Sequence, residues 1–514
     1  MALNWRLHFN FYLLLLLCRK TALKKSNMTP EGRERKVPPP FQAGFDTYLS
    51  PFTYRYGSDP MRKAWSQQRF WGNVRTIWIA AAEVQKEAGL VSKEQLEDLK
   101  THEGDLSVEE IFFLERDPKS GTGHDVAAAI KEYSEVAPIG GEKLHQGFTS
   151  EDVLSNAEIM QIHESFDILK PKLVGTLRAF GKQIQTHKDL VCIGFTHLQA
   201  AEPTTMGYRF AKYAQDLLAD FDLLNYVKAT IKGKGIKGAV GTSASFTELL
   251  KDTGMSSEEH ENKIMKELGI DPVLISDQTY PRKFLFSTEG VLSHIGQTMH
   301  RFALDLQILQ SSVIDEVSEP RRRGQIGSSA MPHKQNPINA ENIASLTEDL
   351  PGKLLSAWMT SSFVTLERTL RDSAGKRSWL PESFLIIDEV LTRAERLVNG
   401  LEVHANSVKT NLNKFAPYAV TEIILTKLCN AGMDRQKAHE ILVSHAENAV
   451  EAVRSGEPNP MKNLIMNDTR VTSLLGKEEV EKSFDEILHH TGEASKSCEA
   501  LLKQIEAITG KIEV

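Results

Sequence analysis

The sequence predicts an all-α protein, built around a bundle of long helices and flanked by smaller N- and C-terminal helical domains. In three long stretches apolar residues recur every three or four positions, which is the spacing of one face of an α-helix. Strand-like alternation is rare from Asp46 onward. The apolar positions are Leu292, Ile295, Met299, Phe302, Leu306, Leu309 and Val313, then Leu173, Leu177, Phe180 and Ile184, and then Ile387, Val390, Ala394, Leu397 and Leu401.

Helix boundaries are predicted from prolines. Pro171 precedes the second stretch and Pro381 precedes the third, so we expect helices to start there, while Glu319-Pro320 is expected to end the first. A chain of 514 residues exceeds one compact core. We therefore predict a disordered extension and linker over 1–43, an N-terminal helical domain over 44–148, the long-helix bundle over 149–403 and a C-terminal helical domain over 404–514.

The N-terminus carries an apolar run, Phe9–Cys18, that is shorter than the about 20 residues a membrane-spanning helix needs. It resembles the core of a signal peptide, but no small-x-small cleavage site follows. We interpret it as an extension outside the fold, absent if translation starts at Met28. A membrane-anchored role would rest on this run alone.

The composition and the spacing of a few residue types argue against several classes of function. The net charge of −7 provides no basic field for a nucleic acid, although small anionic substrates remain possible. Four scattered cysteines form no CxxC pair and no Cys/His ligand spacing. This favours a reducing compartment, the cytoplasm, over a disulfide framework or a metal site. The glycine cluster at 233–241 lacks the Gly-Lys-Ser/Thr of a nucleotide cradle, so we expect a long connection between bundle helices.

The most informative segment is Gly327–Pro337, whose glycines and prolines predict a long loop. A pair of serines is usually only a solvated turn. Here, however, several hydrogen-bonding side chains gather in one loop, which favours a functional site. They are Ser328, Ser329, His333, Lys334 and Asn336.

This segment fits the pattern GSSxMPxKxNP, and it resembles the signature of the fumarase/aspartase superfamily. With histidine at position 333 it is most similar to the adenylosuccinate lyases, although carboxymuconate cycloisomerases share that form. The resemblance implies an all-α bundle and a β-elimination that releases fumarate.

Three further segments resemble superfamily elements. His197 lies in a Thr-His-x-x-x-Ala-x-Pro-Thr context, and His124-Asp125 resembles the His-Asp element. Gly123 replaces the Arg of many relatives, which leaves one phosphate contact open. Thr149-Ser150 by itself reads as a helix cap before acidic residues, but relatives use this pair for a substrate carboxylate.

Other positions distinguish branches within the superfamily. Arg55-Tyr56, Gln278 and the run containing Arg368, Ser373 and Arg377 resemble adenylosuccinate lyase residues that bind phosphate and ribose. Arginine suits this task because its guanidinium donates two parallel hydrogen bonds to a phosphate. A muconate has no phosphate, so these residues favour a nucleotide substrate.

The resemblance implies cleavage of adenylosuccinate to AMP, and of the succinyl-aminoimidazole-carboxamide ribotide (SAICAR) to its amide (AICAR), as in purine biosynthesis. Ser328 would be the base, its alkoxide stabilised by loop N–H groups and Lys334, and His197 would be the acid. No cofactor, metal, nucleic acid or membrane partner is implied, and relatives are homotetramers with sites shared between subunits. The implied substrate-binding residues are Arg55, Tyr56, His124, Asp125, Thr149, Ser150, Gln278, Lys334, Asn336, Arg368, Ser373 and Arg377.

Two alternatives stay open. The chain is another fumarate-releasing lyase or the cycloisomerase, which a substrate panel would distinguish. Or it is an inactive helical scaffold, as in the lens proteins of the argininosuccinate lyase branch. The joint presence of Ser328, Lys334, Asn336, His197 and His124 weighs against a scaffold.

Overall fold

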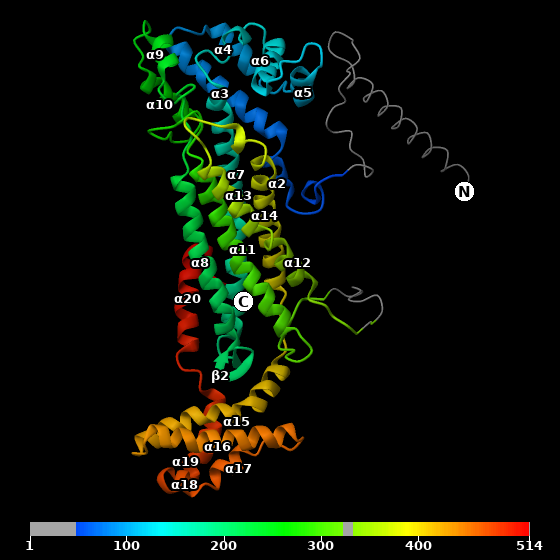
Figure 1. The fold of residues 1–514 in the computed structure, drawn as a ribbon, viewed down its shortest axis with the longest axis vertical. Coiled ribbons are helices and arrows are strands. Elements are labelled where there is room, and N and C mark those ends of the chain that lie inside the picture. The colour runs from blue at the N-terminus through cyan, green and yellow to red at the C-terminus, as the bar shows by residue number, and fades with distance from the viewer. Residues whose placement is uncertain (1–47, 322–330, 332, 513–514) are drawn as a thin grey trace, which may run out of the picture. The chain divides into compact units, whose positions relative to one another are not determined.

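The computed structural model describes residues 48–321, 331 and 333–512. The predicted extension over 1–43 and its apolar run lie outside these residues, as do Gly327–Ala330 and Pro332 of the long loop. In the described part, long helices dominate and the only sheets are two-stranded (Figure 1). The predicted all-α fold is confirmed.

The described chain divides into two compact units. The first consists of the described residues of Met1–Phe166, Lys228–Ser287 and Ser356–Leu385, and the second of those of Asp167–Val227, Thr288–Leu355 and Ile386–Val514. The three consecutive domains predicted from the sequence stay a prediction. Five helices contribute residues to both units, namely α7 (Ser150–His187), α8 (Met206–Thr230), α11 (Lys283–Leu309), α13 (Leu350–Ser362) and α14 (Lys376–Asn399).

The first unit contains mostly short helices, among which α10 packs against α3 (Figure 1). Helix α4 begins in a capping box, in which Ser92 and Gln95 satisfy each other's backbone N–H groups. The elements that lie wholly in the first unit are η1 (Pro51–Thr53), α2 (Asp59–Ala64), α3 (Gln67–Glu87), α4 (Lys93–Thr101), α5 (Val108–Arg116), α6 (Asp125–Val136), η2 (Gly141–Lys143), α9 (Ala244–Leu250), α10 (Ser257–Glu267) and η3 (Leu370–Asp372).

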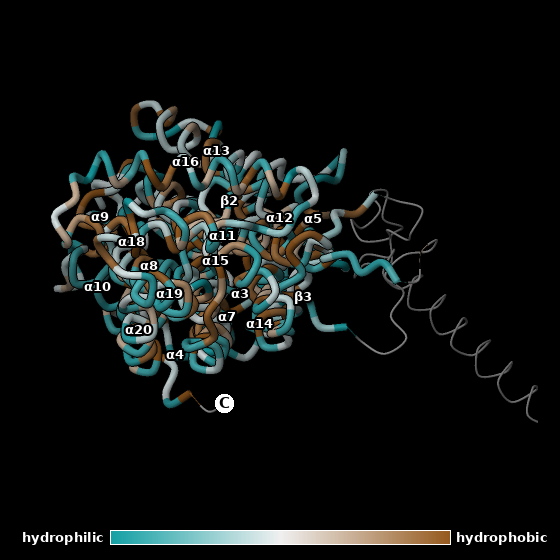
Figure 2. Tube along the Cα trace, turned by 90° about the horizontal axis from the view of Figure 1, so that it is seen from below, coloured by the Kyte–Doolittle hydropathy of each residue, from teal (hydrophilic) through white to brown (hydrophobic). Residues whose placement is uncertain are grey.

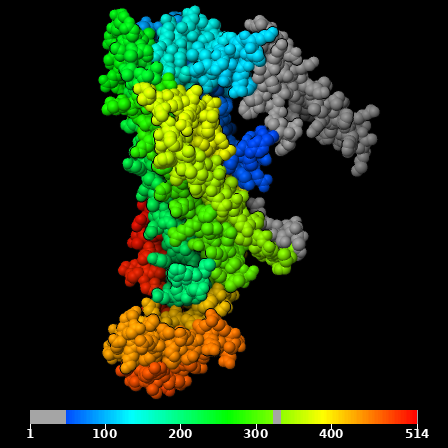
Figure 3. Space-filling view, viewed as in Figure 1, coloured from blue at the N-terminus to red at the C-terminus, as the bar shows by residue number. Residues whose placement is uncertain are grey.

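The second unit contains both two-stranded sheets, of which only β1–β2 is a hairpin, and the C-terminal helices. Strand β1 pairs antiparallel with β2, and β3 with β4. Helices α15 to α19 gather around an apolar core that includes Val420, Ile424 and Leu428, and their surface is orange in Figure 3. The elements are β1 (Val191–Thr196), β2 (Gln199–Thr205), β3 (Val317–Ser318), α12 (Ile338–Thr347), β4 (Glu402–Val403), α15 (Ala405–Asn430), α16 (Arg435–Arg454), α17 (Met461–Met466), α18 (Thr469–Leu475), α19 (Lys477–Glu486), η4 (Ile487–His489) and α20 (Ala494–Thr509).

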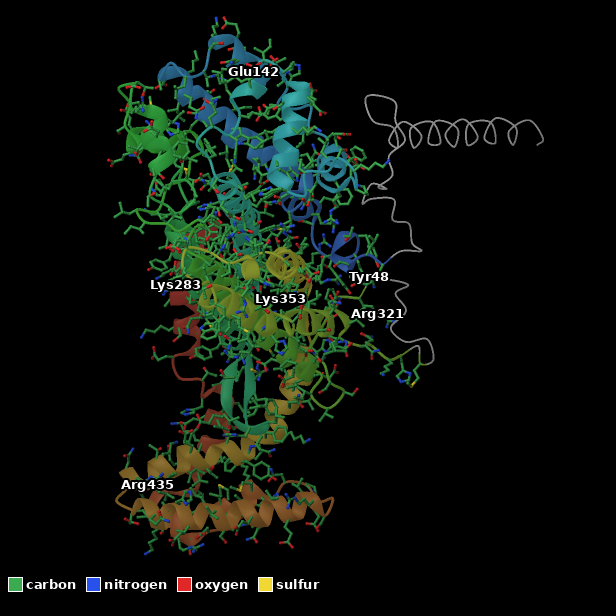
Figure 4. All side chains as sticks on the ribbon, turned by 45° about the horizontal axis from the view of Figure 1, so that its top comes forward. Tyr48, Glu142, Lys283, Arg321, Lys353 and Arg435 are labelled. Carbon is green, nitrogen blue, oxygen red and sulfur yellow. The ribbon has the colours of Figure 1, made fainter. Side chains whose placement is uncertain are left out.

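The predicted apolar seams are confirmed, with one exception. From Leu292 to Leu309, and throughout the other two stretches, the predicted side chains are buried. Along the helices the tube of Figure 2 changes repeatedly between apolar brown and polar teal, as expected of helices with one apolar face. Val313 is 89% exposed, because α11, whose first residue Lys283 is labelled in Figure 4, ends at Leu309.

Three predicted helix boundaries are wrong. Pro171 lies inside α7 and Pro381 inside α14. An internal proline costs about 3 kcal/mol, whereas each buried leucine contributes about 2 kcal/mol, and α7 buries Leu169, Leu173 and Leu177 completely around its proline. Glu319-Pro320 does not end α11, because β3 intervenes.

Candidate functional site

The first unit contains a cavity of about 370 Å³ that is lined by both apolar and charged side chains. Helices α3 and α5 contribute aromatic and aliphatic side chains to the lining, among them Trp71 and Phe112. The polar part of the lining includes all three residues expected to bind phosphate and ribose from the run at 367–377, namely Arg368, Ser373 and Arg377. Asp125 lines the cavity as well, so the structure brings together four predicted positions.

Arg368 contacts a fifth predicted residue, Gln278. Its Nη1 donates to Oε1 of Gln278 at 3.0 Å, and its Nη2 lies 2.7 Å from Oε1 of Glu151. The backbone N–H of Gln278 in turn donates to the carbonyl of Glu367 at 3.3 Å. Two distant segments thus hold one guanidinium in a fixed position at the cavity.

Arg377 faces the start of α6. Its Nη2 lies 3.7 Å from Oδ2 of Asp125 and 3.5 Å from the hydroxyl of Ser373. His124 caps this helix, because its Nδ1 accepts the backbone N–H of Val126 at 3.2 Å. With Nδ1 accepting, Nε2 carries the proton in the neutral ring.

The other ring nitrogen of His124 connects this helix start to that of α7. Nε2 of His124 lies 3.3 Å from Oγ of Ser150. Thr149 and Ser150 are half-buried, and helix α7 begins at Ser150. The expected carboxylate-binding pair therefore adjoins the expected His-Asp element. Gly123, at φ +63°, adopts a left-handed conformation that favours glycine over the Arg of many relatives.

A buried network of charges supports the cavity wall. Oε2 of Glu158 lies 2.8 Å from the ammonium of Lys376 and 3.4 Å from Nη1 of Arg282. Arg282 also binds Asp372 at 2.6 Å. Burial alone would raise the pKa of Glu158, but Lys376 and Arg282 more than offset it and hold the pKa below its usual range.

Glu151 and Glu158 were not predicted from the sequence to be site residues. They lie seven positions apart, about two helical turns, which places both on one face of α7. The spacing of these two glutamates, directly after a helix start that was expected to bind an anion, is the sequence signal that could have identified them.

Arg55 and Tyr56 are placed apart from this cluster. They follow η1 in a turn, with the Arg55 guanidinium 5.7 Å from the centre of the Tyr56 ring. Arg55 is exposed, and neither residue lines the cavity. Their expected contact with phosphate stays a prediction.

His197 belongs to the second unit, where it occupies the two-residue turn between β1 and β2. Both His197 (φ +52°) and Leu198 (φ +59°) adopt left-handed backbone conformations, which asparagine and glycine usually supply in such turns. Backbone strain of this kind clusters at functional sites. The hairpin presents the exposed imidazole at its tip.

Lys334 and Asn336 also lie in the second unit, in the segment before α12, where Lys334 is exposed and Asn336 is half-buried. Ser328, the expected base, lies outside the described residues. Arg321, labelled in Figure 4, is the last described residue before that gap. The roles of these three residues stay predictions.

The residues that the structure describes contain no group of three or more His, Cys, Asp or Glu side chains arranged to hold a metal ion. Nor do they include any helix with both the length and the apolar character needed to cross a membrane.

Comparison with known proteins gives the family. A family model described as "Lyase" matches residues 54–352, and one described as "Adenylosuccinate lyase C-terminus" matches residues 417–501. Adenylosuccinate lyase of Schistosoma mansoni is 36% identical over 429 residues, which are 82% of this chain and 88% of the relative.

Solved structures agree in fold. A fumarate lyase from Mesorhizobium sp. BNC1 superposes with a TM-score of 0.76 at 21% identity, over 89% of this chain and 99% of that one. The 3-carboxy-cis,cis-muconate lactonizing enzyme of Pseudomonas putida gives 0.76 at 20% identity, over 90% and 99%. The Schistosoma mansoni relative and the C-terminal family model together show that this chain belongs to the adenylosuccinate lyase family.

Proposed function

We propose that this enzyme cleaves adenylosuccinate to AMP and fumarate, and SAICAR to AICAR and fumarate, in purine biosynthesis and the purine nucleotide cycle. The observation that carries the proposal is the set of charged and polar side chains that lines the cavity in the first unit. There Arg368, Ser373 and Arg377 gather as a phosphate-binding group would require. Family membership supports the same reaction.

Arg368 and Arg377 are each able to exchange a carboxylate partner for the phosphate of the substrate. Arg368 pairs with Glu151, and Arg377 faces Asp125, so each guanidinium is compensated by a carboxylate before any ligand binds. A phosphate dianion carries more charge than one carboxylate and accepts two parallel N–H bonds from a guanidinium. It can therefore replace these contacts at a net gain.

Elimination needs a base, an acid and sites for two carboxylates. In our proposal Ser328 removes the proton from the succinyl Cβ, the Cα–N bond breaks as the C=C bond forms, and His197 protonates the leaving nitrogen. Lys334, Asn336 and the Thr149-Ser150 turn hold the carboxylates, and His124 orients the substrate. The reaction leaves fumarate and the free amine of the nucleotide.

We also propose a cytoplasmic homotetramer with sites shared between subunits. Helices α11 and α13 carry exposed apolar side chains of the kind that subunit interfaces bury, among them Leu304, Leu355 and Trp358. The free thiols of Cys192 and Cys498 are compatible with a reducing compartment. Light scattering at micromolar concentration tests the tetramer, and a monomer would contradict it.

The assay for the function is incubation of the purified chain with adenylosuccinate, SAICAR and 3-carboxymuconate in parallel. We expect AMP and fumarate in equal amounts from the first, and AICAR and fumarate from the second. Absence of turnover of both would overturn the proposal, and turnover of the muconate alone would favour the cycloisomerase.

A further inference from the structure

The glycine-rich segment at 233–241 packs against the first turn of α7, all within the first unit. Gly235 (φ +85°) and Gly238 (φ +74°) adopt left-handed conformations. A Cβ at Gly235 would lie 1.8 Å from Oε1 of Glu261, so only glycine fits there. The segment thus follows a fixed path that side chains at these positions would block.

Asp152 is the centre of this contact. Its carboxylate is fully buried, and Oδ1 accepts the backbone N–H groups of Lys237 and Gly238, both at 3.1 Å. Oδ2 accepts the backbone N–H of Thr149 at 2.8 Å. One carboxylate therefore joins the glycine-rich segment to the first half of the Thr149-Ser150 pair.

Lys234 neutralises this carboxylate. Its fully buried ammonium contacts Oδ1 of Asp152 and donates to the carbonyl of Gly238 at 2.9 Å. Separating two buried charges is costly, so the pair keeps the segment and the helix start together. Asn156, one turn further along α7, adds a bond from Nδ2 to the carbonyl of Gly235 at 3.0 Å.

A second set of contacts holds the preceding turn. The hydroxyl of Ser245 donates to the carbonyl of Gly147 at 2.7 Å, and the rings of Phe148 and Phe246 meet edge to face at 5.2 Å. From the α3 side, Nε1 of Trp78 donates to Nδ1 of His145 at 3.1 Å. The backbone that leads into Ser150 is thereby fixed from two directions.

We propose that Asp152 and Lys234 are positioning residues that fix the Thr149-Ser150 turn for a substrate carboxylate and cancel each other's charge beneath it. The inference rests on the proposed function, in which this turn binds a carboxylate of the succinyl group. An unpaired Asp152 would repel an anion at the same helix start, whereas the neutral pair leaves the N–H groups of that helix start able to attract it.

This charge argument predicts a pattern that lost packing alone would not produce. Lys234→Met leaves Asp152 negative and should weaken fumarate binding most. The double variant Asp152→Asn/Lys234→Met removes the repulsion and should recover part of the affinity. Lys237→Met is the matched control, because Lys237 lies on the same segment, is similarly buried, and pairs with Glu261 instead.

The test uses the full-length enzyme and measures the inhibition constants of two products, fumarate and AMP, during adenylosuccinate cleavage. For Lys234→Met we expect the fumarate constant to rise about tenfold, as for one lost charged hydrogen bond, with the AMP constant changed less than about twofold. Lys237→Met should leave both constants unchanged. Lys234→Arg, which keeps the charge, should retain most of the fumarate affinity.

Either of two results would overturn the inference: an unchanged fumarate constant in Lys234→Met, or fumarate and AMP constants that rise together. If Lys234→Met does not fold, the Asp152→Asn/Lys234→Met variant decides, since a fumarate constant equal to wild type refutes positioning. If both variants fail to fold, the pair is structural and the inference is wrong. A wild-type enzyme without turnover would instead refute the proposed function.

Discussion

Replacing Arg368 with alanine removes a guanidinium that is 18% exposed and held at two points, by Glu151 and Gln278. The variant should still fold, because Glu151 retains two other partners after Arg368 is removed. Its Oε2 accepts the Ser155 hydroxyl at 2.5 Å and lies 3.6 Å from Nη2 of Arg282. A charged hydrogen bond contributes about 1.5–3 kcal/mol. The loss of two such bonds to phosphate, partly offset by Arg377, should weaken substrate binding by about 3 kcal/mol, or roughly 100-fold.

Because the phosphate lies away from the reacting bond, this loss should affect the ground state and the transition state equally. We therefore expect KM for adenylosuccinate to rise by about two orders of magnitude, while kcat changes less than about threefold. Steady-state kinetics of AMP formation measure both constants. Arg371→Ala is the matched control, because this exposed arginine stacks over Phe363 at 5.2 Å and lies outside the cavity lining. An unchanged KM in Arg368→Ala, or an equal rise in the control, would refute the reasoning.

Three further changes have defined outcomes. Ser328→Ala should lower kcat by several orders of magnitude while substrate still binds in equilibrium dialysis, and near-normal kcat would remove Ser328 as the base. Glu158→Gln removes the negative charge that neutralises Arg282 and Lys376, so the unfolding free energy should fall by about 3 kcal/mol. The measurement is Tm, which should be lower than in the wild type. An unaltered Tm would show that this network does not stabilise the fold. Burial lowers the pKa of His260 to about 4, so the unfolded chain takes up a proton first and stability is lost as pH falls from about 6.5 through 4. His260→Phe should abolish about 3 kcal/mol of that loss in Tm-versus-pH scans, and an identical slope would contradict the assignment.

The sequence predicted the long helices well because an apolar period is a local property that burial then enforces. Leu173 and Leu177 are fully buried as their spacing required. The helix boundaries predicted from prolines were wrong, because the cost of a proline is also a local property and burial can override it. The local cost of Pro171 is real, but the buried residues around it outweigh that cost, and burial is settled by tertiary packing.

The candidate site was predictable only where a motif marked it. Arg368, Ser373 and Arg377 were found by resemblance, and they do line one cavity. Their supports were missed, because the pairing of Glu158 with Arg282 and Lys376 joins segments that are more than 100 residues apart. Charge pairing over such separations leaves no periodic trace in the sequence.

The glycine-rich segment is a connection, as predicted, but it leads from α8 to the short helix α9 and not from one long helix to another. Its contact with Asp152 was not foreseen, because the residue type alone indicated only an acidic first turn. The buried partner Lys234 lies 82 residues away and has no local signature.

The central claim is that this chain cleaves the C–N bond of a succinylated nucleotide whose phosphate it recognises. The most direct measurement compares kcat/KM of the wild-type enzyme for adenylosuccinate and for N6-succinyladenosine, which lacks the phosphate. We expect cleavage of adenylosuccinate to AMP and fumarate, with kcat/KM for the nucleoside lower by at least about 100-fold, as two charged hydrogen bonds require. Equal values for the two compounds, or cleavage of neither, would contradict the account.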